Sequence, residues 1–378
     1  MIEQTLFELL QVAVGNRTEL SATPQADEWK SLYDACQRQS LAGIGFVGVQ
    51  KLPEWQWPQD EDFFLEWVAL ASAIEQRNSY MCLMCHTVTE QIRTDGFGCC
   101  VLKGQGNLAD YPEELRAYRA SGDIDLWCWD TSAARGDGIL PVIDYARSLA
   151  EKAGIHNVKL VYHHTDLIGV WPVSVEIHHR PSFMCSPICN HRFQKWCTAV
   201  RDNVVNEVCM DGYAFPAAAT DFNLVYQLSH IFHHLFDSGI GLRQFLDYYM
   251  VLRAWYENRA PGSETADNAC LMTHIERFGM GRFASAVMYV LQKVFAMPDK
   301  YLICEPDIKE GEFLLRELLL AGNFGVYDKR LSHSKSRVRH AWDKLFRNYA
   351  HFLVHYPREV LCEPFFRLWH FFWRVQAS

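Results

Sequence analysis

Apolar residues near the start of the chain recur every three or four positions, which is the spacing of amphipathic helices. They form two groups: Leu6, Leu9, Leu10 and Ala13, then Trp29, Leu32, Tyr33 and Cys36. A third segment, from about 63 to about 92, contains no glycine or proline and predicts one long helix. We therefore expect residues 1–95 to form a helical region.

After residue 95 the pattern becomes that of short strands. The apolar run 100–102 is typical of a buried strand and ends at Lys103-Gly104. Residues 122–128 alternate instead, and side chains in a strand point alternately to opposite faces. One face is expected to carry Asp123, Asp125 and Trp127, and the other Ile124, Leu126 and Cys128.

A helix over 140–153 and two strands, over 158–162 and 170–178, follow from the same patterns. Alternation in the second strand puts Val173, Val175 and Ile177 toward the core. It puts Ser174, Glu176 and His178 on the opposite face.

The rest of the chain is expected to be helical. Residues 220–236 and 242–255 predict two helices separated by a break at 237–241, and 260–270 predicts a polar loop. Further helices are expected up to about residue 295 and from about 310 to 320.

The pair Asp123 and Asp125 suggests a metal site. Their carboxylates would stand about 7 Å apart on one strand face and would repel each other unless something neutralised them. Oxygen ligands on a rigid strand suit Mg²⁺, which keeps sites for water and phosphate oxygens. Gly104 and Gly106 would let the backbone turn and approach a ligand closely. Together these features indicate phosphate-handling chemistry.

Three motifs carry a family resemblance: Leu102-Lys103-Gly104, Tyr111-Pro112 and Gly122-Asp123-Ile124-Asp125-Leu126. Over roughly residues 30 to 300, the chain resembles the DNA polymerase beta-like nucleotidyltransferase superfamily, and most closely its poorly characterised bacterial branch. The resemblance implies an α+β fold, with a small mixed sheet flanked by helices and helical N- and C-terminal regions. The expected division is 1–95, a catalytic core at 96–215, and a helical domain at 216–378.

The resemblance also implies transfer of a nucleoside monophosphate from an NTP to a hydroxyl acceptor. Asp123 and Asp125 would hold two Mg²⁺ (or Mn²⁺) ions, and Glu176 falls where relatives place the third acidic residue. The alternative for Glu176 is a structural carboxylate paired with Arg180. Lys103 would lie near the phosphates.

The triphosphate would lie against the turn Gly104-Gln105-Gly106. Many members carry Ser or Gly where Gln105 stands, so their hydroxyl contact to phosphate has no counterpart there, and Ser121, next to Gly122, is an alternative source. Arg119 would contact phosphate or pair with Glu113 or Glu114 in a solvated loop.

Two further parts of the nucleotide site are expected. His178 shares the face of Glu176, where it would touch phosphate or acceptor, or face water at a strand edge. The run 239–247 resembles the second-domain motif of the same branch. Its polar members, Arg243, Gln244 and Asp247, would form a wall of the nucleotide pocket, or Arg243 and Asp247 would form a helix-supporting salt bridge.

Composition narrows the partners. With 49% hydrophobic and 21% charged residues, the chain is ordinary globular material. A net charge of −9 argues against broad coating of nucleic acid, so RNA is expected only as an acceptor. No apolar run reaches the length of a membrane span, no signal-peptide pattern is present, and the 13 scattered cysteines indicate reduced thiols in the cytoplasm.

Other features leave competing hypotheses. Cys82-x-x-Cys85 is expected to be a pair of buried thiols rather than a redox or zinc pair. The histidine doublets and the segment 185–197, with Cys185 and Cys189, raise a structural zinc. The basic segment 328–347 would attract an anionic acceptor or be solvated surface, and the aromatic tail 365–375 would dock on the protein or lie at a membrane surface. The rival classes are a catalytically silent nucleotide-binding module and a zinc-stabilised interaction protein.

Overall fold

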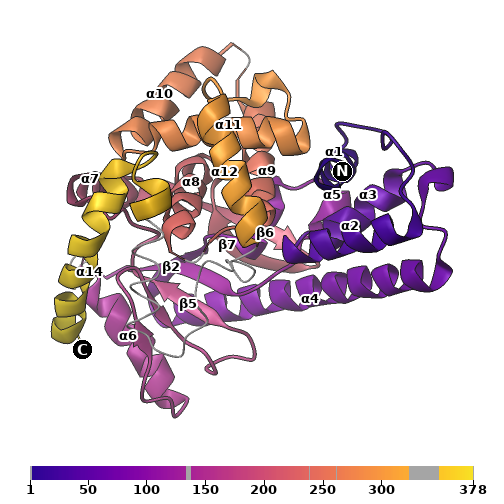
Figure 1. Cartoon of the computed structure of the whole chain (residues 1–378). Coiled ribbons are helices and arrows are strands. Elements are labelled where there is room, and N and C mark those ends of the chain that lie inside the picture. The colour runs from indigo at the N-terminus through magenta and orange to yellow at the C-terminus, as the bar shows by residue number, and fades with distance from the viewer. Residues whose placement is uncertain (1, 133–137, 238, 261, 323–348, 378) are drawn as a thin grey trace. The chain divides into compact units, whose positions relative to one another are not determined.

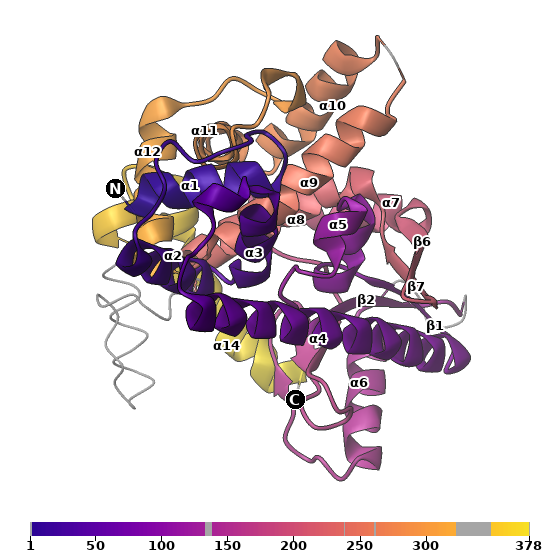
Figure 2. The same cartoon turned by 90° about the vertical axis from the view of Figure 1, so that its right-hand side faces the viewer.

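The structure is a computed structural model that describes residues 2–132, 138–237, 239–260, 262–322 and 349–377 (Figures 1 and 2). It has the expected α+β class, with many helices and a seven-stranded mixed sheet. The chain divides into two compact units. The first comprises residues 1–78, 110–120 and 234–344, and the second comprises 79–109, 121–233 and 345–378. The division at residues 95 and 215 stays a prediction.

The first unit is helical. Its elements are α1 (Ile2–Ala13), α2 (Ala26–Arg38), α3 (Ala42–Lys51), the short 3-10 helix η1 (Glu54–Gln56), α5 (Glu113–Arg116), α9 (Leu242–Asn258), α10 (Glu264–Arg277), α11 (Gly281–Phe295), η4 (Asp299–Tyr301) and α12 (Ile308–Ala321). It also holds the start of α4 (Glu61–Thr94) and the end of α8 (Thr220–Phe236).

The helical periodicity of the N-terminal region is confirmed by α1, α2 and α4. The apolar positions that gave the prediction for α1 and α2 are all buried. The polar loop expected at 260–270 is wrong in its second half, because α10 begins at Glu264. Polar residues did not prevent a helix there, since one face of an exposed helix tolerates them.

The second unit contains the sheet. Its strands are β1 (Phe97–Val101), β2 (Ile124–Asp130), β3 (Lys159–Leu160), β4 (His164–Asp166), β5 (Val175–His178), β6 (Val205–Met210) and β7 (Tyr213–Ala218). Its other elements are the second half of α4, η2 (Gly104–Asp110), α6 (Leu140–Lys152), α7 (Pro187–Val200), η3 (Arg201–Asn203), most of α8, and α14 (Pro357–Ala377).

The strand order is β3-β4-β5-β2-β1-β7-β6. β2 pairs antiparallel with β1 and parallel with β5, so it lies inside the sheet. The strand expected at 158–162 shrinks to Lys159–Leu160, and that expected at 170–178 shrinks to Val175–His178. The hairpin β6–β7 and the short strand β4 are additional to the sequence expectation.

The predicted alternation of faces is confirmed in β2 and β5. Ile124, Leu126 and Cys128 join Val175 and Ile177 in a core cluster completed by α4 and α6. On the other face, the ring of Trp127 stacks on Phe222 of α8, with 5.4 Å between centroids. Figure 1 shows α6 below β2 and β5 and α8 above them. The apolar face of the sheet therefore packs against α4 and α6, and the opposite face, toward α8, carries the polar side chains.

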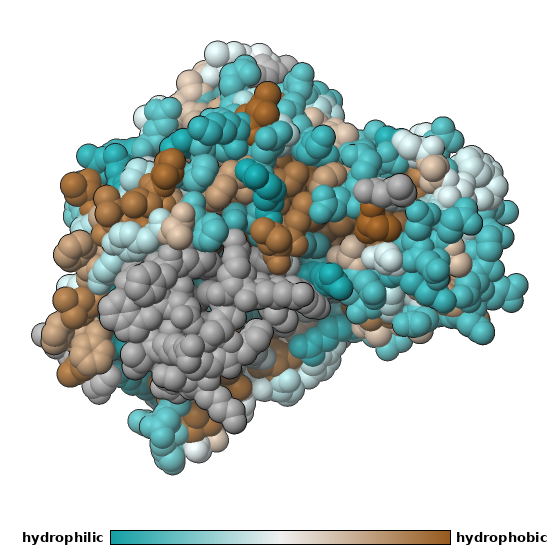
Figure 3. All heavy atoms as spheres, viewed as in Figure 1, coloured by the Kyte–Doolittle hydropathy of each residue, from teal (hydrophilic) through white to brown (hydrophobic). Residues whose placement is uncertain are grey.

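The aromatic tail forms the second half of α14. One side of this helix packs on the rest of the second unit, where Phe366 stacks on Phe183 with 4.8 Å between ring centroids. The docking expected for the tail is thus seen. Its other side stays exposed, and Figure 3 shows hydrophobic side chains along the edge where α14 lies. Among the described helices, none combines the length and apolar character that crossing a membrane requires. The basic segment 328–347 lies outside the described residues.

Candidate functional site

Three carboxylates form a row across neighbouring strands of the second unit. Asp125 on β2 is the register partner of Glu176 on β5, and Glu176 is the partner of Asp166 on β4. Partners in register share a face, so all three point away from the core cluster. Two residues further along, Trp127, His178 and His164 form the next row.

The three acids predicted for the metal site, Asp123, Asp125 and Glu176, differ sharply in exposure. The side chain of Asp125 is 1% exposed, whereas those of Glu176 and Asp123 are 23% and 36% exposed. Asp123 precedes β2, so its carboxylate lies at the more open end of the face. Asp125 therefore anchors the group inside the protein, and the other two acids face more open surroundings.

Lys103 supplies the positive charge. Its Nζ lies 3.0 Å from Asp125 Oδ2 and 3.8 Å from Asp123 Oδ1. Burial alone would lower the pKa of Lys103, but Asp123, Asp125 and Glu176 raise it above the usual value. The lysine is consequently an ammonium ion held against the carboxylates.

The carboxylates respond to this environment in opposite directions. Burial alone would raise the pKa of Asp125, but Lys103 and the hydrogen bond with His178 hold it well below its usual range. The adjacent negative charge of Asp125 raises the pKa of Asp123. At neutral pH, Asp125 is thus a permanent anion.

His178 links two of the acids. Its Nε2 lies 3.0 Å from Asp125 Oδ1 and 3.3 Å from Glu176 Oε2. Burial disfavours the charged imidazole, yet these two partners raise the pKa of His178 to about 9. The ring is 2% exposed, so the alternative of a strand-edge histidine facing water is wrong. Arg180 is engaged elsewhere, since it donates to the Tyr162 carbonyl oxygen and stacks on the Tyr162 ring.

Asp166 and Tyr226 are not predicted as site residues by the sequence patterns, and His164 stands out there only as one of a histidine doublet. His164 Nε2 lies 2.6 Å from Asp166 Oδ1, and Lys159 Nζ lies 2.8 Å from Asp166 Oδ2. The buried hydroxyl of Tyr226 on α8 has its pKa raised by burial and then by Asp125 and Glu176. The alternation His164-Thr165-Asp166 was a usable signal, but a three-residue strand is too short to stand out.

Within the described residues, three groups of side chains bring possible metal-ligand atoms within 4.8 Å of one another. They are Asp125 with Glu176 and His178, His164 with Asp166 and Glu176, and His163 with His164 and His178. Asp123 belongs to none of these groups, and neither does a cysteine. Two carboxylates with an imidazole suit Mn²⁺ and Zn²⁺, while the carboxylates alone suit Mg²⁺. The donor set therefore fits a divalent cation.

The glycine turn lies next to these acids. Gly104 has a φ of +64°, and a Cβ on Gly106 would stand 2.6 Å from the Val101 carbonyl oxygen. Both positions thus require glycine for the backbone path itself. Gln105 is buried, and the Oγ of Ser121 is buried with no hydrogen-bond partner in the structure. Nothing lies within 4 Å of a Cβ built on Gly122.

Four expected nucleotide contacts belong to the first unit: Arg119, Arg243, Gln244 and Asp247, all buried. Arg119 Nε and Nη2 each donate to an Asp247 oxygen at 2.6 Å, and the Tyr111 hydroxyl donates to the same carboxylate at 2.6 Å. Arg243 Nη1 donates to the Ala120 carbonyl oxygen at 2.9 Å. Arg119, which lies outside α9, is thus an ion-pair partner of Asp247.

The cysteine motifs are apolar in character. Cys82 and Cys85 are buried on α4 within the core cluster, as expected for buried thiols. Burial raises the pKa of the Cys82 thiol to about 12 and that of the Cys185 thiol well above its usual value. These thiols are therefore protonated at neutral pH.

A protein-family model described as "Uncharacterised nucleotidyltransferase" matches residues 25–296, which is well over half of the chain. The chain belongs to this nucleotidyltransferase family, as its motifs suggested. No curated protein matches the chain. No solved structure matches it either.

Proposed function

We propose that this chain transfers a nucleoside monophosphate from an NTP to a hydroxyl-bearing acceptor, with a divalent cation bound at the carboxylates. The observation that supports this most is the pairing of Asp125 with Glu176 in register on adjacent strands, on the sheet face that carries polar side chains. Family membership supports the transferase class. The roles of the individual site residues belong to the same proposal.

Asp125 and Glu176 would hold the cation, with Asp123 contributing from the open end of the face. When bound, Mg²⁺ or Mn²⁺ supplies positive charge that stabilises the attacking and leaving oxygens of an in-line displacement. The protein's part is to keep Asp125 ionised and to orient the three carboxylates. The buried hydrogen bond from His178 and the Lys103 ammonium fix Asp125 in one position.

The reaction forms a bond between the acceptor oxygen and the α-phosphorus, and it breaks the bond to the bridging oxygen of pyrophosphate. The hydroxyl proton passes to Glu176, the more exposed member of the strand pair. Because phosphoryl chemistry asks little covalent work of the protein, positioning and charge neutralisation account for most of the catalysis.

The triphosphate would lie at the start of η2. Backbone N–H groups at the start of this turn would donate to phosphate oxygens, as in other glycine-rich anion sites, whereas the Gly106 N–H already donates to the Lys103 carbonyl oxygen at 3.1 Å. The Ser121 hydroxyl, buried and with no hydrogen-bond partner among the described residues, would replace the hydroxyl that the position of Gln105 does not provide. When a metal ion binds the carboxylates, the Lys103 ammonium would neutralise negative charge of the phosphates instead.

One observation favours a second candidate, a nucleotide-binding module without turnover. The Lys103 ammonium already neutralises Asp125 and Asp123, at the place where a divalent cation is expected to act. An internal cation of this kind competes with a metal ion. Binding of nucleotide with no transfer to any acceptor would support this candidate.

The test is incubation of the purified chain with each α-labelled NTP, Mg²⁺ or Mn²⁺, and a cell extract as the source of acceptors. We expect label in a metabolite, RNA or protein with the native chain but not with Asp123→Ala/Asp125→Ala. Asp144→Ala is the control, because that carboxylate is an exposed residue of α6 outside the site. Equal labelling by the native and double-variant chains would refute the proposal.

A further inference from the structure

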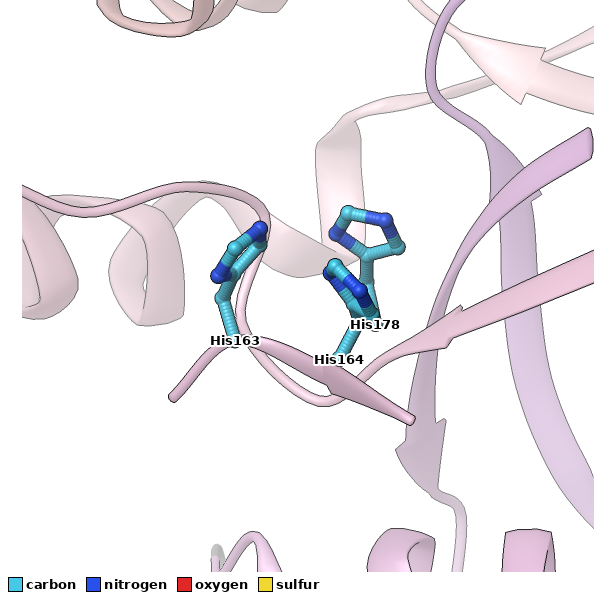
Figure 4. Close-up of side chains that lie close together, drawn as sticks. All are labelled: His163, His164 and His178. Carbon is cyan, nitrogen blue, oxygen red and sulfur yellow. The ribbon is translucent and has the colours of Figure 1, made fainter. Parts of the chain in front are cut away.

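Next to the carboxylate row, three histidines converge. His163 directly precedes β4, His164 begins it, and His178 ends β5. One ligand nitrogen of each histidine lies within 4.8 Å of the other two. Their ring centroids are 4.4, 5.2 and 4.9 Å apart. Figure 4 shows the three imidazoles standing side by side above β4. Three imidazoles at this spacing are a ligand set for a transition metal ion.

The hydrogen bonds leave ligand nitrogens available. Nε2 of His178 contacts Asp125 and Glu176, but its Nδ1 is buried and has no hydrogen-bond partner among the residues that the structure describes. The same is true of Nδ1 of His163 within that part of the chain. His178 is 2% exposed, so water has little access to hydrogen-bond its Nδ1. A buried ring nitrogen of this kind is unfavourable unless a ligand satisfies it.

The outer partners match those of metal-binding histidines. Such histidines usually bond their second ring nitrogen to a carboxylate, which fixes the ring orientation. His178 Nε2 makes this contact with Asp125 at 3.0 Å. His164 Nε2 lies 2.6 Å from Asp166 Oδ1, and its Nδ1 lies 3.4 Å from Glu176 Oε2. Two of the three rings therefore have a carboxylate next to a ring nitrogen.

We propose that His163, His164 and His178 form a binding site for a transition metal ion, with Zn²⁺ as the expected occupant. Nitrogen ligands favour Zn²⁺ over Mg²⁺, which prefers oxygen. Three histidines leave a fourth coordination position for water or another small ligand. This site is distinct from the proposed Mg²⁺ site in its donor atoms, and it is coupled to that site through the bond between His178 and Asp125. It does not depend on whether the chain transfers nucleotides.

The test uses the full chain, freed of metal and titrated with Zn²⁺ against a chromophoric chelator in millimolar Mg²⁺. We expect about one Zn²⁺ per chain that Mg²⁺ does not displace. His163→Ala is expected to weaken Zn²⁺ binding at least about tenfold, and Asp166→Asn about 10- to 100-fold. Asp144→Ala should leave the affinity unchanged, because Asp144 is an exposed carboxylate of α6 that belongs to none of the ligand groups.

His191→Ala is the matched control, since His191 is an exposed histidine of the same unit and lies near Cys185 and Cys189 in sequence. Zn²⁺ should raise the thermal midpoint of the native and His191→Ala chains equally, and that of His163→Ala by clearly less. X-ray absorption of the zinc complex should show imidazole scattering. Displacement by Mg²⁺, unchanged affinity in His163→Ala, or loss only in Cys185→Ser/Cys189→Ser would overturn the proposal.

Discussion

Replacing Asp247 tests whether the ion pair in the first unit is structural. Arg119 and Asp247 are each 4% exposed. Two donors of Arg119 and the Tyr111 hydroxyl occupy the oxygens of Asp247, with all three distances at 2.6 Å. Asp247→Ala would leave a buried guanidinium without a counter-charge, because burial there allows little water to replace the carboxylate.

The expected loss follows from this geometry. Removing one partner of a buried pair costs about 3–5 kcal/mol, because the remaining charge stays desolvated. Two charge-assisted hydrogen bonds at about 1.5–3 kcal/mol each give a similar figure. Arg119→Met/Asp247→Leu removes both charges together, so it should lose clearly less than the sum of Arg119→Met and Asp247→Leu.

Because the chain has two compact units, the assay must report on the first unit alone. Amide hydrogen exchange of α9 during urea titration gives the free energy of opening for that helix. Lys30→Ala is the control, since its pair with Asp60 has side-chain exposures of 53% and 37% and should contribute at most about 1 kcal/mol. A loss below about 1 kcal/mol in Asp247→Ala, or additive losses in the double variant, would refute the structural role.

Three further predictions concern the second unit. Lys103→Met removes the cation beside Asp125, so we expect a loss of about 2–4 kcal/mol in unfolding free energy. Mn²⁺ should then stabilise the variant against heat more than it stabilises the native chain, and an equal effect would contradict this. Gly106→Ala should destabilise by about 1–3 kcal/mol in urea unfolding, because its Cβ meets the Val101 carbonyl oxygen, whereas Gly122→Ala, with open space, should be near neutral. Burial, and then Arg374 and Arg367, lower the pKa of His370 to about 4. The neutral ring therefore stabilises the docking of α14 by roughly 1 kcal/mol above the unfolded pKa of 6.5, and this stabilisation is lost as the pH falls toward 4. Proteolysis of α14 should rise over that range in the native chain but not in His370→Phe.

The sequence was most informative where strands alternate regularly. Asp123, Asp125 and Glu176 were placed on one face because their apolar neighbours, among them Ile124 and Val175, demanded the other. A one-residue shift would have exposed every apolar side chain, so the pattern left little freedom. The orientation of the acidic face could therefore be predicted from local order alone.

Contacts between distant residues could not be predicted in this way. Lys103 was assigned to phosphate, and its ion pair with Asp125 depends on how the end of β1 meets β2. Arg119 and Asp247 are 128 residues apart in sequence, so no local pattern could pair them. The strand β4 is three residues long, and its His164 and Asp166 become notable only when pairing places them beside Glu176.

The most direct test of the proposed transfer compares the fate of two labels. The native chain, with Mg²⁺ or Mn²⁺ and its acceptor, should move the α-phosphorus label of the NTP into the product and release the γ label as pyrophosphate. Glu176→Gln, which keeps the shape of the side chain but removes its charge, should slow that transfer by about 100-fold or more. Movement of the γ label into the product, or an unchanged rate in Glu176→Gln, would contradict the account.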